Sequence, residues 1–432
     1  MLTKIKNLTN NSFVRNVATL ASGTAAAQAL TMAFAPFLTR LYGPEAFGVQ
    51  GVFITLSSIL ATVAALCYPT AIVLPKSDDD ARGLAKLSVY LAFAISIITT
   101  LLLWLFGQQL LILINSEVIF DFIYLIPIFM LFSVFSAVLG QWLIRKNAFK
   151  VSAVTSVWQS FLINSIKAGF GFVAPSAAVL VITSTAGNLL QAYLLFSGLA
   201  RKGNDIYKKS NTTKIPALLV LAKQYGDFAL LRSPQVFLNA VSHSLPIVLL
   251  ATYYGPIAVG YYTITNSVLG MPTVLIGASV MQVFYPKANE TYQNGESISA
   301  LIIKTTLSMA AVGAVPFMVV ILFGPFLFKY FFGSEWLTAG IYAQWLASWF
   351  FLGYVSRPAI AAIPVLRLQK GFFFYEIFST ASKAGAIILG YYFFKSDVVA
   401  IALFSIAGCF AYLYLIAWVA LSANRKIYIE SL

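Results

Sequence analysis

Two short stretches of this chain carry the same turn. Residues 41–49 read LYGPEAFGV, and residues 253–261 read YYGPIAVGY. Each stretch contains a Tyr-Gly-Pro triplet followed by a glycine, and the triplets lie 212 residues apart. Because Gly and Pro form tight turns for conformational reasons, we assign them no chemistry. A turn that recurs at this separation predicts a chain built from two related halves.

The composition predicts an integral membrane protein. The chain of 432 residues is 60% hydrophobic and only 10% charged, with a mean hydropathy of +0.85. A water-soluble fold does not bury so large an apolar fraction. A helix needs about 20 apolar residues to cross a bilayer. Twelve stretches meet this length, at residues 16–39, 48–74, 84–106, 122–144, 151–172, 176–199, 228–251, 259–285, 300–323, 337–361, 371–393 and 398–421.

The repeat continues beyond the opening turn. Pro75 and Lys76 are echoed by Pro286 and Lys287 at an offset of 211, and after an insertion Arg145 pairs with Arg367. Six spans in each half would make the halves enter the membrane from the same side, which is a parallel repeat. We therefore predict an all-α integral membrane fold with twelve transmembrane helices in two six-helix lobes around a central cavity. The predicted parts are an N-lobe (1–200), a cytoplasmic linker (201–225) and a C-lobe (226–432).

Basic residues predict the orientation of the chain. With both termini in the cytoplasm, 21 of the 28 Lys and Arg lie in cytoplasmic loops or at the helix ends beside them, 4 lie within spans, and 3 lie outside. This bias follows the positive-inside rule. The net charge of +14 is thus a signal of topology, and it argues against nucleic-acid binding.

The sequence lacks the signatures of catalysis. No G-x-x-x-x-G-K-[ST] motif is present to hold nucleotide phosphates. His243 is the single histidine, and the two cysteines, Cys67 and Cys409, lie in apolar segments without the spacing of a metal or redox site. We predict no catalytic residue, no metal and no bound cofactor.

Four basic residues lie within predicted spans: Lys167, Arg232, Arg357 and Lys383. A charge at the bilayer centre costs about 2.5 to 3.5 kcal/mol on insertion scales, so these residues are expected to face a hydrated interior. Helical spacing places them on polar stripes. The stripes are Thr24, Gln28 and Thr31; Ser156, Ser160, Asn164 and Lys167; Arg232, Gln235, Asn239 and His243; and Glu376, Ser379, Thr380 and Lys383.

Other roles remain open for most of these residues. Arg232, Arg357 and Lys167 lie near helix ends, from which a long side chain can reach lipid headgroups. Hydroxyl groups can also bridge neighbouring helices. Lys383 lies near the middle of its span, where it either faces a cavity or forms an ion pair with Glu376. The predicted substrate-binding set is Lys383, Arg232, Arg357, Lys167, Gln235, Asn239, Asn164 and Gln28, with Glu376 and His243 as candidates for ion coupling.

The segments LTRLYGPEAFGVQ (38–50) and FGSEW (332–336), with the double repeat, resemble the bacterial polysaccharide flippases of the Wzx type. These belong to the multidrug/oligosaccharidyl-lipid/polysaccharide exporter superfamily. The resemblance implies alternating access through a cationic cavity in the inner membrane. It also implies that the cargo is an undecaprenyl-diphosphate-linked repeat unit for O-antigen, lipopolysaccharide or exopolysaccharide. A polysaccharide polymerase and a chain-length regulator are implied as candidate partners, beside membrane lipids.

Such a cargo suits the residues. Arg and Lys among hydroxyl and amide groups can replace the water shell of a diphosphate, and the membrane potential favours outward movement of negative charge. Coupling to H⁺ or Na⁺ is a further hypothesis. A multidrug exporter of the same superfamily is the first alternative, although four basic residues against one acid favour an anionic cargo. A membrane-embedded polymerase or acyltransferase is the lower alternative.

We expect Lys383→Ala to impair translocation of lipid-linked glycan, because it removes a positive charge from the middle of a span. Membrane insertion should stay intact. Surface-glycan output in cells that lack any other flippase measures the effect, and normal output would reject the role of Lys383.

Overall fold

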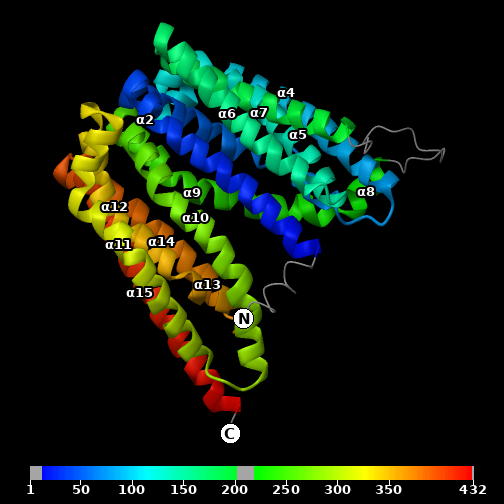
Figure 1. The fold of residues 1–432 in the computed structure, drawn as a ribbon. Coiled ribbons are helices and arrows are strands. Elements are labelled where there is room, and N and C mark those ends of the chain that lie inside the picture. The colour runs from blue at the N-terminus through cyan, green and yellow to red at the C-terminus, as the bar shows by residue number, and fades with distance from the viewer. Residues whose placement is uncertain (1–11, 202–217, 431–432) are drawn as a thin grey trace. The chain divides into compact units, whose positions relative to one another are not determined.

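The computed structural model describes residues 12–201 and 218–430, and every regular element in them is helical (Figure 1). Among these residues, nine helices are long and apolar enough to cross a membrane. This confirms the prediction of an all-α membrane protein. Residues 202–217, which make up most of the predicted linker, lie outside the described residues. The chain divides into two compact units, residues 1–248 and 249–432, with the border inside one helix.

The first unit consists of long helices that pack in neighbouring pairs. The helix α2 packs against α5, α6 and α7, and α4 packs against α5. Its core includes the fully buried side chains of Trp142, Phe53 and Leu84. The elements are α2 (Ser12–Ala61), α3 (Tyr68–Ala71), α4 (Asp78–Leu113), η1 (Glu117–Phe122), α5 (Leu125–Arg145), α6 (Phe149–Val173), α7 (Ala177–Arg201), α8 (Leu218–Gln224), η2 (Phe228–Arg232) and α9 (Ser233–Tyr254), which crosses the border.

The second unit also consists of helices that pack in neighbouring pairs. Helix α12 packs against α10, α11 and α15, and α14 packs against α15. A core cluster at one end includes Phe284, Ile302 and Leu415. The elements are α10 (Pro256–Gln293), α11 (Ile298–Phe332), η3 (Ser334–Trp336), α12 (Leu337–Val355), α13 (Arg357–Val365), α14 (Gln369–Leu389), η4 (Gly390–Phe394) and α15 (Asp397–Glu430).

The two Tyr-Gly-Pro turns have the same backbone conformation. Gly43 has φ 68° and ψ 172°, and Gly255 has φ 82° and ψ −178°. This region is essentially restricted to glycine, because a Cβ would clash with the backbone. The following proline, with its fixed φ, suits the first turn of the next helix, and Pro256 begins α10. The repeated motif therefore encodes a repeated break between two helices.

Beyond the turns the correspondence shifts to an offset of 220. Ser77 and Ser297 both cap the next helix by accepting a backbone N–H through the side chain. The starts of α6 and α14, Phe149 and Gln369, also differ by 220, as do the starts of α7 and α15. The insertion that changes the offset therefore lies between Gly255 and the start of α11 at Ile298.

The pairing of Arg145 with Arg367 that the sequence predicted is wrong by two residues. Helices α5 and α13 end in the same way, with Asn147 and Arg367 at φ 52° and 53°. In each case the next residue donates a hydrogen bond back across this turn, from Ala148 to Leu143 and from Leu368 to Ile363. Backbone geometry therefore aligns Arg367 with Asn147, and Arg145 has no basic counterpart.

Three predicted segments differ in detail from the structure. The span predicted at 48–74 ends as a helix at Ala61, and the turns that follow place Leu66 and Cys67 at positive φ. The span at 337–361 is interrupted at Ser356, between α12 and α13. Residues 218–224 of the predicted linker form the helix α8. Apolar composition alone could not locate these breaks, because a turn inside an apolar run does not change its hydropathy.

We expect Gly255→Ala to lower the thermal stability of the purified protein in detergent. A residue with a Cβ at this φ and ψ costs about 1 to 3 kcal/mol of strain. No other atom lies within 4 Å of the added Cβ, so the cost is one of backbone conformation alone. Gly385→Ala in α14 is the matched control, since its Cβ also meets nothing within 4 Å and its backbone is helical. Equal effects of the two changes would contradict this interpretation.

Candidate functional site

A hydrogen-bonded seam joins α2 to α6 in the first unit. The hydroxyls of Thr31 and Ser160 lie 2.9 Å apart, and Ser160 donates to the Ala27 carbonyl at 2.9 Å. The Asn164 side chain donates to the Ser160 carbonyl at 2.8 Å and to the Thr31 hydroxyl at 3.4 Å. Asn164 is only 6% exposed. The predicted stripes on these two helices therefore meet each other, and their central residues bridge helices.

Next to this seam, Lys167 forms a polar centre with two residues that the sequence did not single out. The Lys167 ammonium donates to the Ser184 hydroxyl at 3.5 Å, and the Gln50 amide donates to the same hydroxyl at 2.7 Å. The Tyr42 hydroxyl donates to the backbone carbonyl of Lys167 at 2.5 Å. Among the described residues, no acidic group forms an ion pair with Lys167. The ammonium thus keeps donors free for an anion.

The equivalent positions of the second unit are apolar or aromatic. Gln50 corresponds to Tyr262 at the offset of 212, while Lys167 and Ser184 correspond to Ile387 and Phe404 at 220. The rings of Tyr262 and Phe404 pack edge to face with centroids 6.4 Å apart. All three of these side chains are at most 4% exposed. The fold is therefore stable with an apolar centre here, and the polar one in the first unit is a specialisation.

In the second unit, the interior lysine is Lys383, which does not occupy the position equivalent to Lys167. The Lys383 ammonium on α14 lies 5.6 Å from the ring centroid of Trp349 and 6.0 Å from that of Phe404. Gly408 permits the approach of Trp349, because a Cβ there would lie 2.4 Å from the indole ring. Both rings offer their faces to the cation, an interaction worth about 0.5 to 2 kcal/mol. Lys383 is thus held inside the unit by aromatic groups.

Of the two alternatives predicted for Lys383, the ion pair with Glu376 is not among the ion pairs of the described residues. Two N–H donors in this region are buried without an acceptor, Nε1 of Trp349 and Nε of Arg357. The Tyr412 ring stacks on that of Trp349 with centroids 6.4 Å apart. Unpaired buried donors are costly, so each of these two N–H groups is a candidate to bind an anion.

The other predicted residues lie on exposed surfaces of their helices. Arg232 donates to Gln235 at 3.0 Å, so these two predicted residues do meet. The remaining ones, Gln28, Asn239, His243 and Glu376, are exposed and stay predictions. In the described parts of the chain, no group of three or more His, Cys, Asp or Glu could hold a metal ion.

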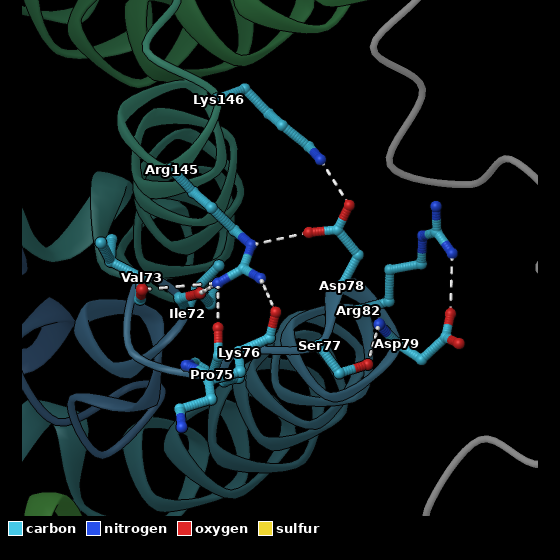
Figure 2. Close-up of polar contacts among 10 residues, drawn as sticks. All are labelled: Ile72, Val73, Pro75, Lys76, Ser77, Asp78, Asp79, Arg82, Arg145 and Lys146. Carbon is cyan, nitrogen blue, oxygen red and sulfur yellow. Dashed lines mark hydrogen bonds and ion pairs between the residues drawn. The ribbon is translucent and has the colours of Figure 1, made fainter.

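At one end of the first unit, Arg145, Lys146 and Asp78 form a polar cluster that the sequence analysis did not predict as a site (Figure 2). We call this cluster the basic clasp. Arg145, the last residue of α5, donates from Nε to Asp78 at 3.0 Å and from Nη1 to the Pro75 carbonyl at 2.6 Å. Longer bonds, of 3.3 to 3.4 Å, reach the carbonyls of Ile72, Val73 and Lys76. One guanidinium thus satisfies four carbonyls of the irregular segment that leads into α4.

Asp78 connects the clasp to a second cation. Lys146 forms an ion pair with its other carboxylate oxygen. Asp78 lies at the polar start of α4, ahead of the apolar residues 84–106, and the bond from Lys146 is the main reason that the pKa of its carboxyl is held below the usual range. A signal was present in the sequence as the run of three aspartates, Asp78–Asp80, and the adjacent basic pair Arg145 and Lys146, although 67 residues separate Asp78 from Arg145.

Comparison with known proteins gives a consistent result. Residues 37–340 match the model of a family described as "Polysaccharide biosynthesis protein". The chain is 23% identical over 369 residues to the succinoglycan biosynthesis transport protein ExoT of Rhizobium meliloti (strain 1021), a match that covers 82% of this chain and 69% of the relative.

Two solved structures show the same fold. One is an inward-facing conformation of a multidrug resistance MATE family transporter of the MOP superfamily, with a TM-score of 0.70 at 14% identity, covering 93% of this chain and 95% of that one. The other is the lipid II flippase MurJ in an inward closed conformation, with a TM-score of 0.68 at 14% identity, covering 95% of this chain and 91% of that one. At this level of identity the likeness concerns the fold alone.

We expect Arg145→Lys to destabilise the first unit by about 1 to 3 kcal/mol, because a lysine keeps the charge for Asp78 but leaves the carbonyls of the buried residues Ile72 and Pro75 unpaired. Thermal unfolding in detergent measures the loss. Arg82→Lys is the control, since Arg82 forms one partly exposed ion pair with Asp79 three residues before it, and such pairs contribute about 0 to 1 kcal/mol. A loss at Arg145 no larger than at Arg82 would show that the carbonyl contacts contribute little.

Proposed function

This chain belongs to the polysaccharide biosynthesis protein family, and we propose that it is the flippase that carries undecaprenyl-diphosphate-linked oligosaccharide from the cytoplasmic to the periplasmic leaflet. The family and the matched relative are those of a transporter and not of an enzyme. The polysaccharide transport role of that relative supports the proposal, as does the fold shared with a lipid II flippase.

The observation that carries the proposal is that Lys383 lies over aromatic rings and, among the described residues, forms no ion pair with an acid. Lys383 is held by aromatic rings, and the N–H groups of Trp349 and Arg357 are buried without acceptors. A diphosphate offers several anionic oxygens, and hydrogen bonds between charged groups are the strongest that proteins make. Lys167 supplies a comparable cation in the first unit. Each centre by itself offers a cation to an anionic head, while the lipid tail stays in the membrane.

The energetics of such a cycle are favourable. A hydrophilic glycan and a diphosphate cannot cross hydrocarbon unaided, because each buried charge and polar group loses its water. With the cell interior negative, outward movement of two negative charges releases about 5 kcal/mol per 100 mV, since each charge contributes about 2.3 kcal/mol. The membrane potential can therefore drive part of the transport. Coupling to H⁺ or Na⁺ through Glu376 or His243 remains a hypothesis.

The proposal includes a twelve-helix architecture in the inner membrane, with both termini in the cytoplasm. Three spans add to the nine that hydropathy identifies in the described residues. The break at Gly43 divides α2 into two spans, and α6 and α10, of 25 and 38 residues, are long enough to cross a bilayer. Two six-helix lobes would then enclose a cavity that opens alternately to each side. A polymerase and a chain-length regulator are the proposed protein partners.

A multidrug exporter is the second candidate, on the basis of the fold shared with a multidrug resistance transporter. The interior charges argue against it. A cavity for cationic drugs would need acidic side chains among the buried groups, whereas both polar centres described above are basic.

We expect Trp349→Phe to weaken binding of undecaprenyl diphosphate by about tenfold or more. The ring that holds Lys383 is kept, but the Nε1–H donor is lost, and a hydrogen bond to a charged group is worth about 1.5 to 3 kcal/mol. The measurement is binding to the purified protein in nanodiscs, followed by transport of a lipid-linked glycan in proteoliposomes.

Trp345→Phe is the matched control, because Trp345 lies on the same helix but lines a separate apolar groove with Cys409 and Phe410. If both changes had the same effect on binding, the Trp349 donor would not be part of the substrate site.

A further inference from the structure

Three groups share the Ser184 hydroxyl in the interior of the first unit. Ser184 donates its proton to the Leu180 carbonyl at 2.7 Å, and its oxygen accepts from the Gln50 amide at 2.7 Å and from the Lys167 ammonium at 3.5 Å. A hydroxyl has one proton and two lone pairs, so these contacts use its whole capacity. Ser184 has no proton left to donate, and a side chain that contacts its oxygen must therefore be a donor.

Gln50 meets this requirement with its amide nitrogen. Gln50 lies on α2 and is 7% exposed, and its nitrogen also lies 3.5 Å from the Leu180 carbonyl, which is a second acceptor. The amide thus donates toward two oxygens without adding a charge. The carboxylate of a glutamate has almost the same size and shape, but when ionised it only accepts hydrogen bonds. Gln50 therefore supplies donors at a position where a similar acidic side chain would supply a negative charge.

The positive charge of Lys167 is not cancelled in this arrangement. Among the described residues, the ammonium forms one hydrogen bond, the long one to Ser184, and no ion pair. The nitrogens of Gln50 and Lys167 contact the same oxygen. A charge on residue 50 would consequently lie within the range of about 4 to 6 Å over which it acts strongly on the lysine. The charge of residue 50 thus decides the net charge of this centre.

Packing does not explain the buried amide. Burial of an amide costs free energy that an apolar side chain does not cost. The second unit fills the positions of Gln50, Lys167 and Ser184 with Tyr262, Ile387 and Phe404. The amide and the hydroxyl are therefore present in the unit that has a lysine at this place and absent from the unit that lacks it. Their role is best understood through the lysine.

From this geometry we propose that Gln50 is a specificity-determining residue, which sets the preference of the Lys167 centre for anions. Its neutral amide saturates Ser184 and holds that hydroxyl in place, while the charge of the lysine stays available to an anionic group. A glutamate at position 50 would pair with Lys167 and make the centre neutral. The choice of a diphosphate as the anion rests on the proposed flippase function.

The first test is Gln50→Glu in the purified full-length protein in nanodiscs, with inorganic pyrophosphate and undecaprenyl diphosphate as the two probes. We expect both to bind about tenfold or more weakly, because the new carboxylate competes with the anion for the ammonium. Unchanged binding of both probes would overturn the proposal. A loss confined to the lipid would also overturn it, since the effect would then concern the tail and not the charged head.

Gln159→Glu is the matched control. It adds the same charge to the same unit at a half-buried position of α6, eight residues, or about 12 Å along the helix, before Lys167. We expect it to leave the affinity for both probes nearly unchanged. An equal loss in Gln159→Glu and Gln50→Glu would show a general effect of negative charge, and the special role of Gln50 would be wrong.

A second test measures the coupling of the two residues without any substrate. Gln50→Glu should lower the Tm in detergent by several degrees more in a Lys167→Met background than in the wild type, because only the wild type offers the buried carboxylate a partner. Equal shifts in the two backgrounds would contradict this proposal alone. Coupling in a wild type that binds neither probe would instead contradict the proposed flippase function, and the anion preference of Gln50 with it.

Discussion

The structure depends on the need to pair every backbone polar group within a largely apolar chain. In hydrocarbon no water is present to hydrogen-bond a free N–H or C=O, so a spanning segment must be a helix that satisfies its own backbone. Irregular backbone is then restricted to helix ends, and those ends need special residues. Gly43 and Gly255 adopt a conformation that only glycine accepts readily, while Ser77 and Ser297 cap the helices that follow. At the segment before α4, the Arg145 guanidinium pairs with the carbonyls that no helix satisfies.

The two units share their backbone architecture but not their polar chemistry. Helix ends, caps and turns recur at offsets of 212 and 220, yet Lys167 corresponds to Ile387 and Asp397 to Ala177. Packing requires only that each interior position be filled, and an apolar side chain fills it without the cost of desolvation. Polar groups therefore persist inside a unit at a cost in stability, and a functional role is the usual compensation. The basic centres at Lys167 and Lys383 are such places.

Aromatic rings stabilise the buried positive charge of Lys383. A lysine in an apolar surrounding is often neutralised by an acid, which would also cancel its attraction for an anion. Trp349 and Phe404 instead stabilise Lys383 through their ring faces, which carry no net charge. The positive charge stays available. This arrangement suits a transporter that must bind an anion and release it again, because a substrate need not compete with a fixed carboxylate.

Composition, length of apolar runs and the repeated Tyr-Gly-Pro motif were enough to predict a membrane protein of helices with an internal repeat, because these properties are local and the bilayer imposes one length on every span. Helical spacing also predicted one polar face that includes Thr31 and, on another span, a second polar face that includes Ser160 and Asn164. It could not show that these faces meet, that Gln50 and Ser184 join Lys167, or that Lys383 lies over Trp349. Those pairings join different helices, and only packing in three dimensions decides which faces come together.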